Sequence, residues 1–323
     1  MDKHTRHQLL STIFSLRQGE YSKCFAPPGV CPNPTIRAHS VQNAQVLDLL
    51  AVNGHLVAPT VRMDGRSGVS LEFARIGRNR ATTFAGLCAD HDRDLFLRIE
   101  TAPIDPEDPE HAFLLSYRAV LYELHATCAA ATMLQLGYQK RVNLGLDPRE
   151  QPSQAGMYAT ERMIVSYETF MYKLAFDAAY AKRDFSCLSH DLVPLSVARP
   201  TIAASALFSM DHLQRGDDTV RATLTVLPLA KDRTVALFSY LNEDAELARS
   251  ELANILTAKE GEVLRPLSVR LLNNCQNFVV APDYFAGWSP EKLASITTFF
   301  TQTLMHDDLD NPSPHLQLFA AVA

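Results

Sequence analysis

Apolar residues recur along this chain with two different periods, which predict an architecture of both helices and strands. Residues 3–17 carry one stripe at helical spacing, and residues 40–54 read as a short helix between Ser40 and the stop signal Asn53-Gly54. Residues 55–63 and 70–77 instead read as strands joined at a turn near Asp64-Gly65. The opening stripe is formed by Leu9, Leu10, Ile13, Phe14 and Leu16. We therefore expect an amphipathic first helix, a short second helix and a β-hairpin.

The middle of the chain is dominated by helical periodicity. Residues 82–99 predict one helix, on which Cys88 and His91 lie one turn apart on the same face. Two longer helices follow over about residues 111–141 and 155–183, and the polar loop between them favours an antiparallel hairpin. Their aromatic side chains suit the core of this hairpin or a surface that binds a partner. They include Tyr117, Tyr122, Tyr158, Tyr167, Phe170 and Tyr172.

The C-terminal half returns to strand patterns. Residues 222–230 and 234–241 predict strands on either side of a turn at Lys231-Asp232. Helices are expected over about residues 244–259 and after Ser289-Pro290. The acidic, proline-rich residues 102–110 predict a linker, which would divide the chain into domains of residues 1–103 and 104–323. The fold class is therefore expected to be α+β, with a central helical hairpin and a C-terminal α+β domain.

Composition narrows the class of protein. A chain of 323 residues with 47% hydrophobic content can build a sizeable core, and six cysteines without a signal-peptide pattern favour a reducing, cytoplasmic setting. The longest apolar stretch, residues 119–138, contains Glu123, His125 and Gln135, so no membrane span is expected. The net charge of −6 argues against a general nucleic-acid coat. Residues 1–100 nevertheless hold 12 Lys and Arg against 9 Asp and Glu, so this third could face phosphates.

Four residues of the N-terminal third form a candidate metal site. Cys24 and Cys31 lie in a proline-rich stretch that excludes a regular helix, while Cys88 and His91 have the i, i+3 spacing of a metal-binding turn. Three cysteines and one histidine are a donor set typical of structural Zn²⁺. The alternative is that Cys24 and Cys31 are small core residues and that His91 is a surface histidine.

The stretches "IRAHSVQ" and "GLCADHD" around these ligands resemble the HNH-type treble clef, the ββα-metal fold of many endonucleases. The resemblance is limited to about residues 20–100 and implies an N-terminal zinc module in this α+β chain. It implies that His39 is a general base and that Asp92 stands where the family binds a catalytic metal, here Mg²⁺ or Mn²⁺. The implied activity is phosphodiester hydrolysis on DNA or RNA. His39 is also readable as a further zinc ligand or as a buried histidine bonded to backbone.

Other residues bear on whether this HNH-like site is active. The asparagine that the family places just before the helix cysteine is missing, since Thr83 and Phe84 occupy that neighbourhood. Arg75, Arg78 and Arg80 are candidate phosphate ligands, or else a solvated loop. The sequence thus leaves two hypotheses. One is a zinc-containing protein that acts on nucleic acid, as a metal-dependent nuclease if the site is active. The other is an inactive zinc-stabilised module that binds a protein partner, with the C-terminal domain as its recognition surface.

Motifs of other enzyme classes are missing. The sequence has no GxSxG nucleophile elbow, no GxxxxGK[ST] phosphate loop and no GxGxxG dinucleotide motif. Cys128, Cys187 and Cys275 are isolated and are expected to be packed core thiols.

Overall fold

The computed structural model describes residues 21–27, 29, 31–64, 68–151, 153–216, 218–259, 261–303, 313 and 315–322. The helix expected over residues 3–17 lies outside these ranges. The structure is mixed α+β and divides into two compact units. Unit 1 consists of Met1–Ala38, Phe84–Asp92 and Val120–Arg183. Unit 2 consists of His39–Thr83, Arg93–Ala119 and Asp184–Ala323, so residues 1–103 are shared between the two units and the expected linker of residues 102–110 lies within unit 2.

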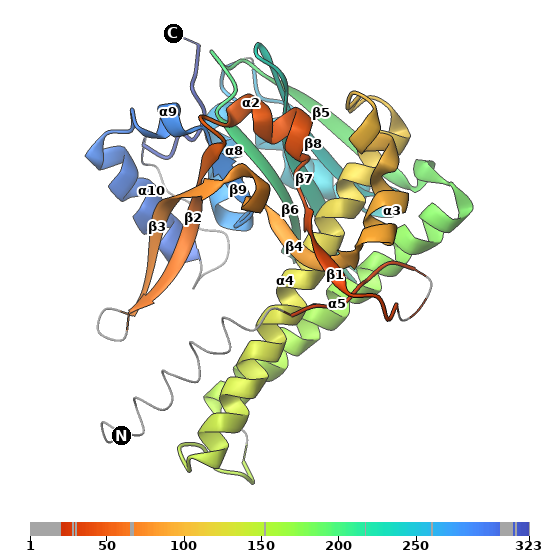
Figure 1. The fold of residues 1–323 in the computed structure, drawn as a ribbon, viewed down its shortest axis with the longest axis vertical. Helices are drawn as coiled ribbons and strands as arrows, with labels where there is room; N and C mark the ends of the chain where they lie inside the picture. The colour runs from red at the N-terminus through yellow and green to blue at the C-terminus, as the bar shows by residue number, and fades with distance from the viewer. Residues whose placement is uncertain are drawn as a thin grey trace. The chain divides into compact units, whose positions relative to one another are not determined.

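Unit 1 is built on two long helices, α4 (Pro109–Asn143, from Val120 onward in this unit) and α5 (Gln154–Lys182). They run side by side as the expected hairpin (Figure 1). Two contacts show that the helices are antiparallel. The Cys128 thiol is hydrogen-bonded to the Ser166 side chain. Gly156 packs closely against the Tyr138 ring, so that a Cβ there would lie only 2.7 Å from it. The loop between the helices ends at Ser153, whose hydroxyl accepts a hydrogen bond from the backbone N–H of Gly156 and so caps α5.

Two short strands complete the regular part of unit 1. β1 (Thr35–His39) and β4 (Thr83–Cys88) pair as a two-stranded sheet, and β4 continues directly into α3 (Ala89–Thr101). The single helix predicted over residues 82–99 is therefore wrong for its first seven residues, 82–88, of which the last six form β4. The segment "TFAGLC" is buried at five consecutive positions, a pattern that a short buried strand and a buried helix share.

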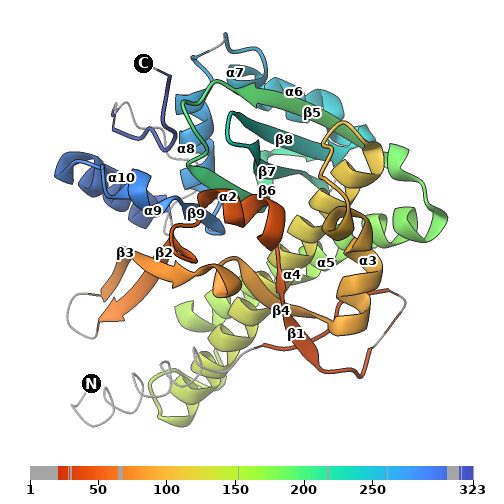
Figure 2. The ribbon, with the colours of Figure 1, turned by 45° about the horizontal axis from the view of Figure 1, so that its top comes forward.

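Unit 2 is organised around a seven-stranded sheet of order β3-β2-β9-β6-β7-β8-β5, whose paired strands are all antiparallel (Figure 2). Its hairpin of β2 (His55–Asp64) and β3 (Gly68–Gly77) and its pair β7 (Asp218–Ala230) and β8 (Arg233–Leu241) confirm the predicted strands. The other strands are β5 (Leu188–Leu195), β6 (Ile202–Arg215) and β9 (Phe278–Val280).

One face of this sheet carries the core of unit 2. Alternate residues of β6, β7 and β8, among them Phe208, Leu224 and Phe238, pack with buried side chains of the C-terminal helices. These helices are α6 (Ala245–Glu251), α7 (Ala253–Leu256), α8 (Leu264–Asn274) and α10 (Pro290–Thr303). The helix expected over residues 244–259 is thus divided at Leu252. Unit 2 also contains two short helices, α2 (Asp48–Leu50) and α9 (Pro282–Phe285). A π-turn over Asn43–Leu47 precedes α2.

An ion pair between the buried Arg118 and the exposed Glu100 links α3 to the first part of α4 within unit 2. The Arg118 side chain is 2% exposed, its Nη1 donates to Glu100 Oε1 at 2.7 Å, and its guanidinium lies 4.0 Å from the centre of the Phe96 ring. The Gln42 amide donates to the other Glu100 oxygen at 3.1 Å. Among the described helices, none has the length and apolar composition that crossing a membrane requires.

Candidate metal centre

The two N-terminal cysteines are held by a loop that folds back on itself. Cys24 and Cys31 face each other across an isolated antiparallel bridge, and Pro27, Pro32 and Pro34 around them prevent a helix. The backbone N–H of Phe25 donates to the carbonyl oxygen of Gly86 at 2.9 Å, which ties this loop to β4. The close approach needs a glycine, because a Cβ at Gly86 would lie 2.6 Å from the Phe84 ring and 3.3 Å from the Phe25 ring.

The other two ligands lie where β4 becomes α3. Cys88 is the last residue of the strand and His91 is in the first turn of the helix, so their side chains reach the same point although they do not share one helix. Asp90 and Asp92 stand in the same turn, where acidic side chains favour a helix N-terminus. Cys88 and His91 do come together as predicted, but Cys88 ends a strand, so the helix predicted to carry both residues is wrong.

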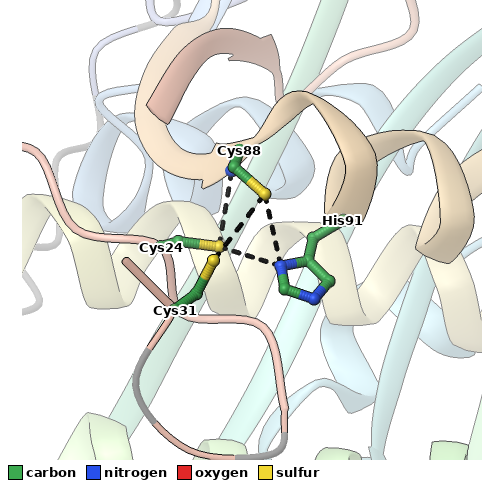
Figure 3. A group of neighbouring side chains, drawn as sticks. All are labelled: Cys24, Cys31, Cys88 and His91. Atoms are coloured by element: carbon green, nitrogen blue, oxygen red, sulfur yellow. Dashed lines mark hydrogen bonds between the residues drawn. The ribbon is translucent and has the colours of Figure 1, made fainter. Parts of the chain in front are cut away.

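The four side chains converge on one point (Figure 3). His91 Nδ1 lies 3.3 Å from the Sγ atoms of both Cys24 and Cys88, and the Sγ atoms of Cys31 and Cys88 are 3.9 Å apart. All four ligand atoms lie within 4.8 Å of one another. Around a tetrahedral metal with bonds of about 2.3 Å to sulfur and 2.0 Å to nitrogen, the edges are roughly 3.8 Å and 3.5 Å. The cluster therefore has the size and the donor atoms to hold a metal ion.

Backbone groups support negative charge on the sulfurs. Burial opposes the thiolate of Cys88, but hydrogen bonds from the His91 backbone and from neighbouring side chains outweigh it and lower the pKa of Cys88. Burial raises the pKa of the Cys24 thiol. The backbone N–H groups of Ala26 and Cys88 hydrogen-bond its sulfur and lower the pKa, but burial is the larger effect. The Cys88 N–H lies 3.4 Å from Cys24 Sγ. A bound cation would favour both thiolates.

Aromatic rings join β4 to α4 within unit 1. The Phe84 ring packs edge-on against Tyr122 and His125, with ring centres 5.6 Å and 5.8 Å apart. His125 Nε2 bonds the backbone carbonyl of Tyr21 at 2.8 Å, and Tyr21 stacks on Phe25. The cysteine loop is thus fixed to β4 by backbone and to α4 by rings.

A cavity of about 670 Å³ lies between the cysteine loop and α5. Its wall includes Cys24, Cys31 and the ion pair of Lys173 with Asp177, in which Nζ lies 2.6 and 2.7 Å from the carboxylate oxygens. Burial lowers the pKa of Lys173, while Asp177 and Cys24 act in the opposite direction. Sequence patterns did not single out this lysine. Its only signal was an i, i+4 Lys-Asp pair within a largely apolar helix.

His39 stands apart from the four ligands and belongs to unit 2. Its Nε2 lies 3.4 Å from the carbonyl oxygen of Arg78, as in the interpretation of a histidine bonded to backbone. Burial lowers the pKa of His39, so that the ring is neutral at pH 7. The four-residue cluster does not use it as a ligand.

The remaining predicted residues are distributed over both units. Arg75 is exposed on β3, and Arg78 and Arg80 lie in the 3-10 turn Arg78–Arg80 of unit 2, where Arg78 forms an ion pair with Asp48. Asp92 follows His91 in unit 1. Asn79, the asparagine that most closely precedes Cys88 in the sequence, lies in unit 2 and accepts a hydrogen bond from the amide of Asn43. The side chain of Asn33 hydrogen-bonds Cys88.

Comparisons with protein-family models, with curated proteins and with solved structures find no match in any of the three.

A second feature of unit 1 is the side of α5 that faces away from α4. Seven large apolar side chains on it are 39–64% exposed and recur at intervals of three, four and seven residues. We call this set the outer face of α5: Met157, Met163, Ile164, Tyr167, Phe170, Met171 and Leu174. The opposite side of the helix is also apolar and is buried, with Ala159, Tyr172 and Phe176 each at most 8% exposed.

Proposed function

We propose that this chain is a zinc-stabilised protein-interaction module without catalytic activity. Cys24, Cys31, Cys88 and His91 bind one structural Zn²⁺, and the outer face of α5 is the contact surface. The observation that carries the proposal is the closed donor set. Four protein side chains complete a tetrahedral shell and leave no position for water, whereas catalytic zinc sites keep one position open.

The surroundings of the cluster support zinc. Three thiolates and one neutral imidazole around Zn²⁺ carry a net charge of about −1. Lys173, which is 2% exposed, lines the cavity beside Cys24 and Cys31, and its coulombic interaction with Cys24 favours the thiolate, while its own charge is balanced by Asp177. Bound zinc supplies cross-linking of the loop of residues 24–31 to the junction of β4 and α3, and no chemistry on a substrate.

The contact surface is argued from the size of the outer face. Large apolar side chains each have roughly 150–250 Å² of surface, so seven that are about half exposed present on the order of 600 Å². Monomeric soluble proteins rarely expose a larger continuous apolar patch, and such patches usually mark binding sites. Aromatic and methionine side chains, which this face contains, are enriched at the centres of interfaces.

A metal-dependent nuclease that acts on DNA or RNA is the second candidate, and two observations favour it. The His39 ring is neutral at pH 7, as a general base must be, and Arg75 and Arg80 are exposed for phosphates. Asp92 would hold the catalytic Mg²⁺ or Mn²⁺. Against this candidate, His39 bonds the Arg78 carbonyl, and the Arg78 side chain pairs with Asp48.

One set of measurements separates the two candidates. Purified protein should contain about one zinc per chain by elemental analysis. With Mg²⁺ or Mn²⁺ it should leave plasmid DNA and structured RNA intact and show no salt-sensitive binding to either. Cleavage that disappears in His39→Ala would establish the nuclease instead.

The contact surface is tested by affinity capture from cell extract. Ile164→Asp/Tyr167→Asp should lose the proteins that the wild-type chain retains, while Arg149→Ala/Glu150→Ala, which changes exposed residues of the loop between α4 and α5, should keep them. Identical captured proteins for all three would reject the surface and leave only the structural zinc.

A further inference from the structure

Lys292 of unit 2 has no carboxylate partner within the described part of the chain, which is unusual for a half-buried lysine. It stands in the first turn of α10, and its Nζ donates a hydrogen bond to the Tyr284 hydroxyl of α9 at 3.0 Å. The same Nζ lies 5.0 Å from the centre of the Tyr284 ring and 4.8 Å from that of the Trp288 ring. The residue is partly exposed, so a small molecule can reach it from solvent.

Aromatic side chains make the surroundings of this amine weakly polar. Trp288 packs on Phe285 and on Phe73 of β3, with ring centres 5.1 Å and 5.4 Å apart. The hairpin of β2 and β3, which supplies Phe73, lies beside α9 and α10 (Figure 2). Burial among these rings disfavours the ammonium form, and attraction between the cation and the ring faces offsets part of that penalty.

The local charges also favour the neutral amine. Lys292 is the third residue of α10, where the positive end of the helix dipole opposes a cation. The nearby acidic groups have other partners: Asp283 pairs with Arg199. Glu291 is hydrogen-bonded by Ser289 and by its own backbone N–H. Burial lowers the pKa of Lys292 to about 8, so that roughly a tenth of it is unprotonated at pH 7, against less than about a thousandth of an ordinary lysine.

We propose that Lys292 is a nucleophilic lysine that binds apolar aldehydes, above all aromatic ones, as a reversible imine. The Tyr284 hydroxyl is a proton donor within hydrogen-bonding distance of the amine, and the neighbouring rings offer a surface for an apolar group. The site lies wholly in unit 2 and goes beyond the proposed function, which concerns unit 1. Imine formation is a stoichiometric binding reaction and requires no turnover.

The two side chains divide the steps between them. The unprotonated Nζ forms a bond to the carbonyl carbon, and a proton passes from the nitrogen to the carbonyl oxygen, which gives a carbinolamine. Tyr284 donates its phenol proton to the departing hydroxyl group, which leaves as water, and the phenolate then takes the remaining proton from the nitrogen. Burial raises the pKa of Tyr284 to about 12, so the phenol holds its proton at pH 7 until this step.

Reductive trapping in the full-length protein tests the lysine. Benzaldehyde with sodium cyanoborohydride at pH 7 converts an imine to a stable benzylamine, which peptide mapping by mass spectrometry locates. Lys292 should be labelled roughly tenfold faster than the exposed Lys231 and Lys259 of the same unit, because its larger unprotonated fraction outweighs the lower nucleophilicity of a less basic group, a trade-off known for thiols. The fast phase should be absent in Lys292→Arg. Equal or slower labelling of Lys292 would overturn the proposal.

Tyr284→Phe tests the proton donor. It keeps the ring beside Trp288 and removes the hydroxyl, so labelling of Lys292 by benzaldehyde should slow by roughly tenfold or more. Labelling by trinitrobenzenesulfonate, in which the amine displaces sulfite without a proton donor, should not slow. A fall in both rates, or an unchanged rate with benzaldehyde, would overturn the role assigned to Tyr284.

The class of aldehyde is tested on the wild-type chain. Glyceraldehyde, a polar aldehyde, should show a smaller preference for Lys292 over Lys231 than benzaldehyde does, because it gains little from the aromatic surroundings. An equal or larger preference would overturn the assignment to apolar aldehydes.

Discussion

Replacement of Cys88 by serine is the most informative single change, because this residue joins β4, α3 and the metal cluster. Cys88 is buried, at 2% exposure. Its Sγ lies 3.3 Å from His91 Nδ1 and 3.9 Å from Cys31 Sγ. A serine hydroxyl is nearly the same size but does not ionise near neutral pH, so the packing is kept and a thiolate ligand is lost. We expect zinc to be released and unit 1 to be destabilised.

The magnitude follows from mass action. When free zinc is held at about one hundred times its dissociation constant, binding to the folded state contributes about 2.7 kcal/mol. Unit 1 contains on the order of 100 residues, and for such a unit each kcal/mol moves Tm by roughly 4 °C. The transition of unit 1 should therefore fall by about 10 °C in Cys88→Ser, and by a similar amount when a chelator is added to wild type.

Scanning calorimetry and elemental analysis of the same samples measure both effects. Cys275→Ser is the matched control, since Cys275 is 1% exposed, lies in unit 2 and is outside the cluster. It should retain about one zinc per chain. Zinc retained by Cys88→Ser, or an unchanged transition after zinc is lost, would refute the reasoning that metal binding and folding of unit 1 are coupled.

Three further results are expected from single substitutions. His39→Ala should keep about one zinc per chain by elemental analysis, because the ring bonds the Arg78 carbonyl and is not a ligand; loss of zinc would place His39 in the shell. Arg118→Ala should lower the unfolding free energy of unit 2 by roughly 2 kcal/mol in urea, since it removes a buried side chain, its contact with Phe96 and its ion pair with the solvent-accessible Glu100. Exposed Arg93→Ala on α3 should change it by less than about 0.5 kcal/mol. Burial lowers the pKa of His190 to about 4, below the unfolded value of 6.5, so the unfolded state binds the extra proton and unit 2 should lose stability as pH falls from 6.5 to 4. His190→Gln should flatten that pH dependence in urea titrations, and an unchanged slope would assign it to other groups.

The sequence predicted the ligands of the metal cluster better than their surroundings. Cysteine and histidine spacing reports donor chemistry directly, so the pattern predicted that Cys24, Cys31, Cys88 and His91 come together, as they do in the structure. The strand that delivers Cys88 was mistaken for a helix, because "TFAGLC" is apolar at nearly every position and its pairing partner, β1, lies some fifty residues earlier. Periodicity is a local signal and cannot report a distant partner.

The same limit applies to the sheet of unit 2. The hairpins at Asp64-Gly65 and Lys231-Asp232 were predicted from turn residues, which act locally. The pairing of β2 with β9, more than two hundred residues later, follows from no local pattern, and it depends on a single register pair, Val57 with Val280. The long helices α4 and α5 were predicted almost to their ends, whereas the exposure of one side of α5 emerged only when its neighbours were placed.

The division of the chain into two units affects how its function can be mapped. The backbone passes from one unit to the other five times, at residues 38, 83, 92, 119 and 183. Residues 39–83 leave unit 1, belong to unit 2 and then return to unit 1. Cys31 precedes this segment and Cys88 follows it, so one ion bound by both would close the segment into a loop. No single truncation point yields either unit intact, so deletion fragments would fail in both units together. Point substitutions in the full-length chain are the perturbations that can assign a role to each unit.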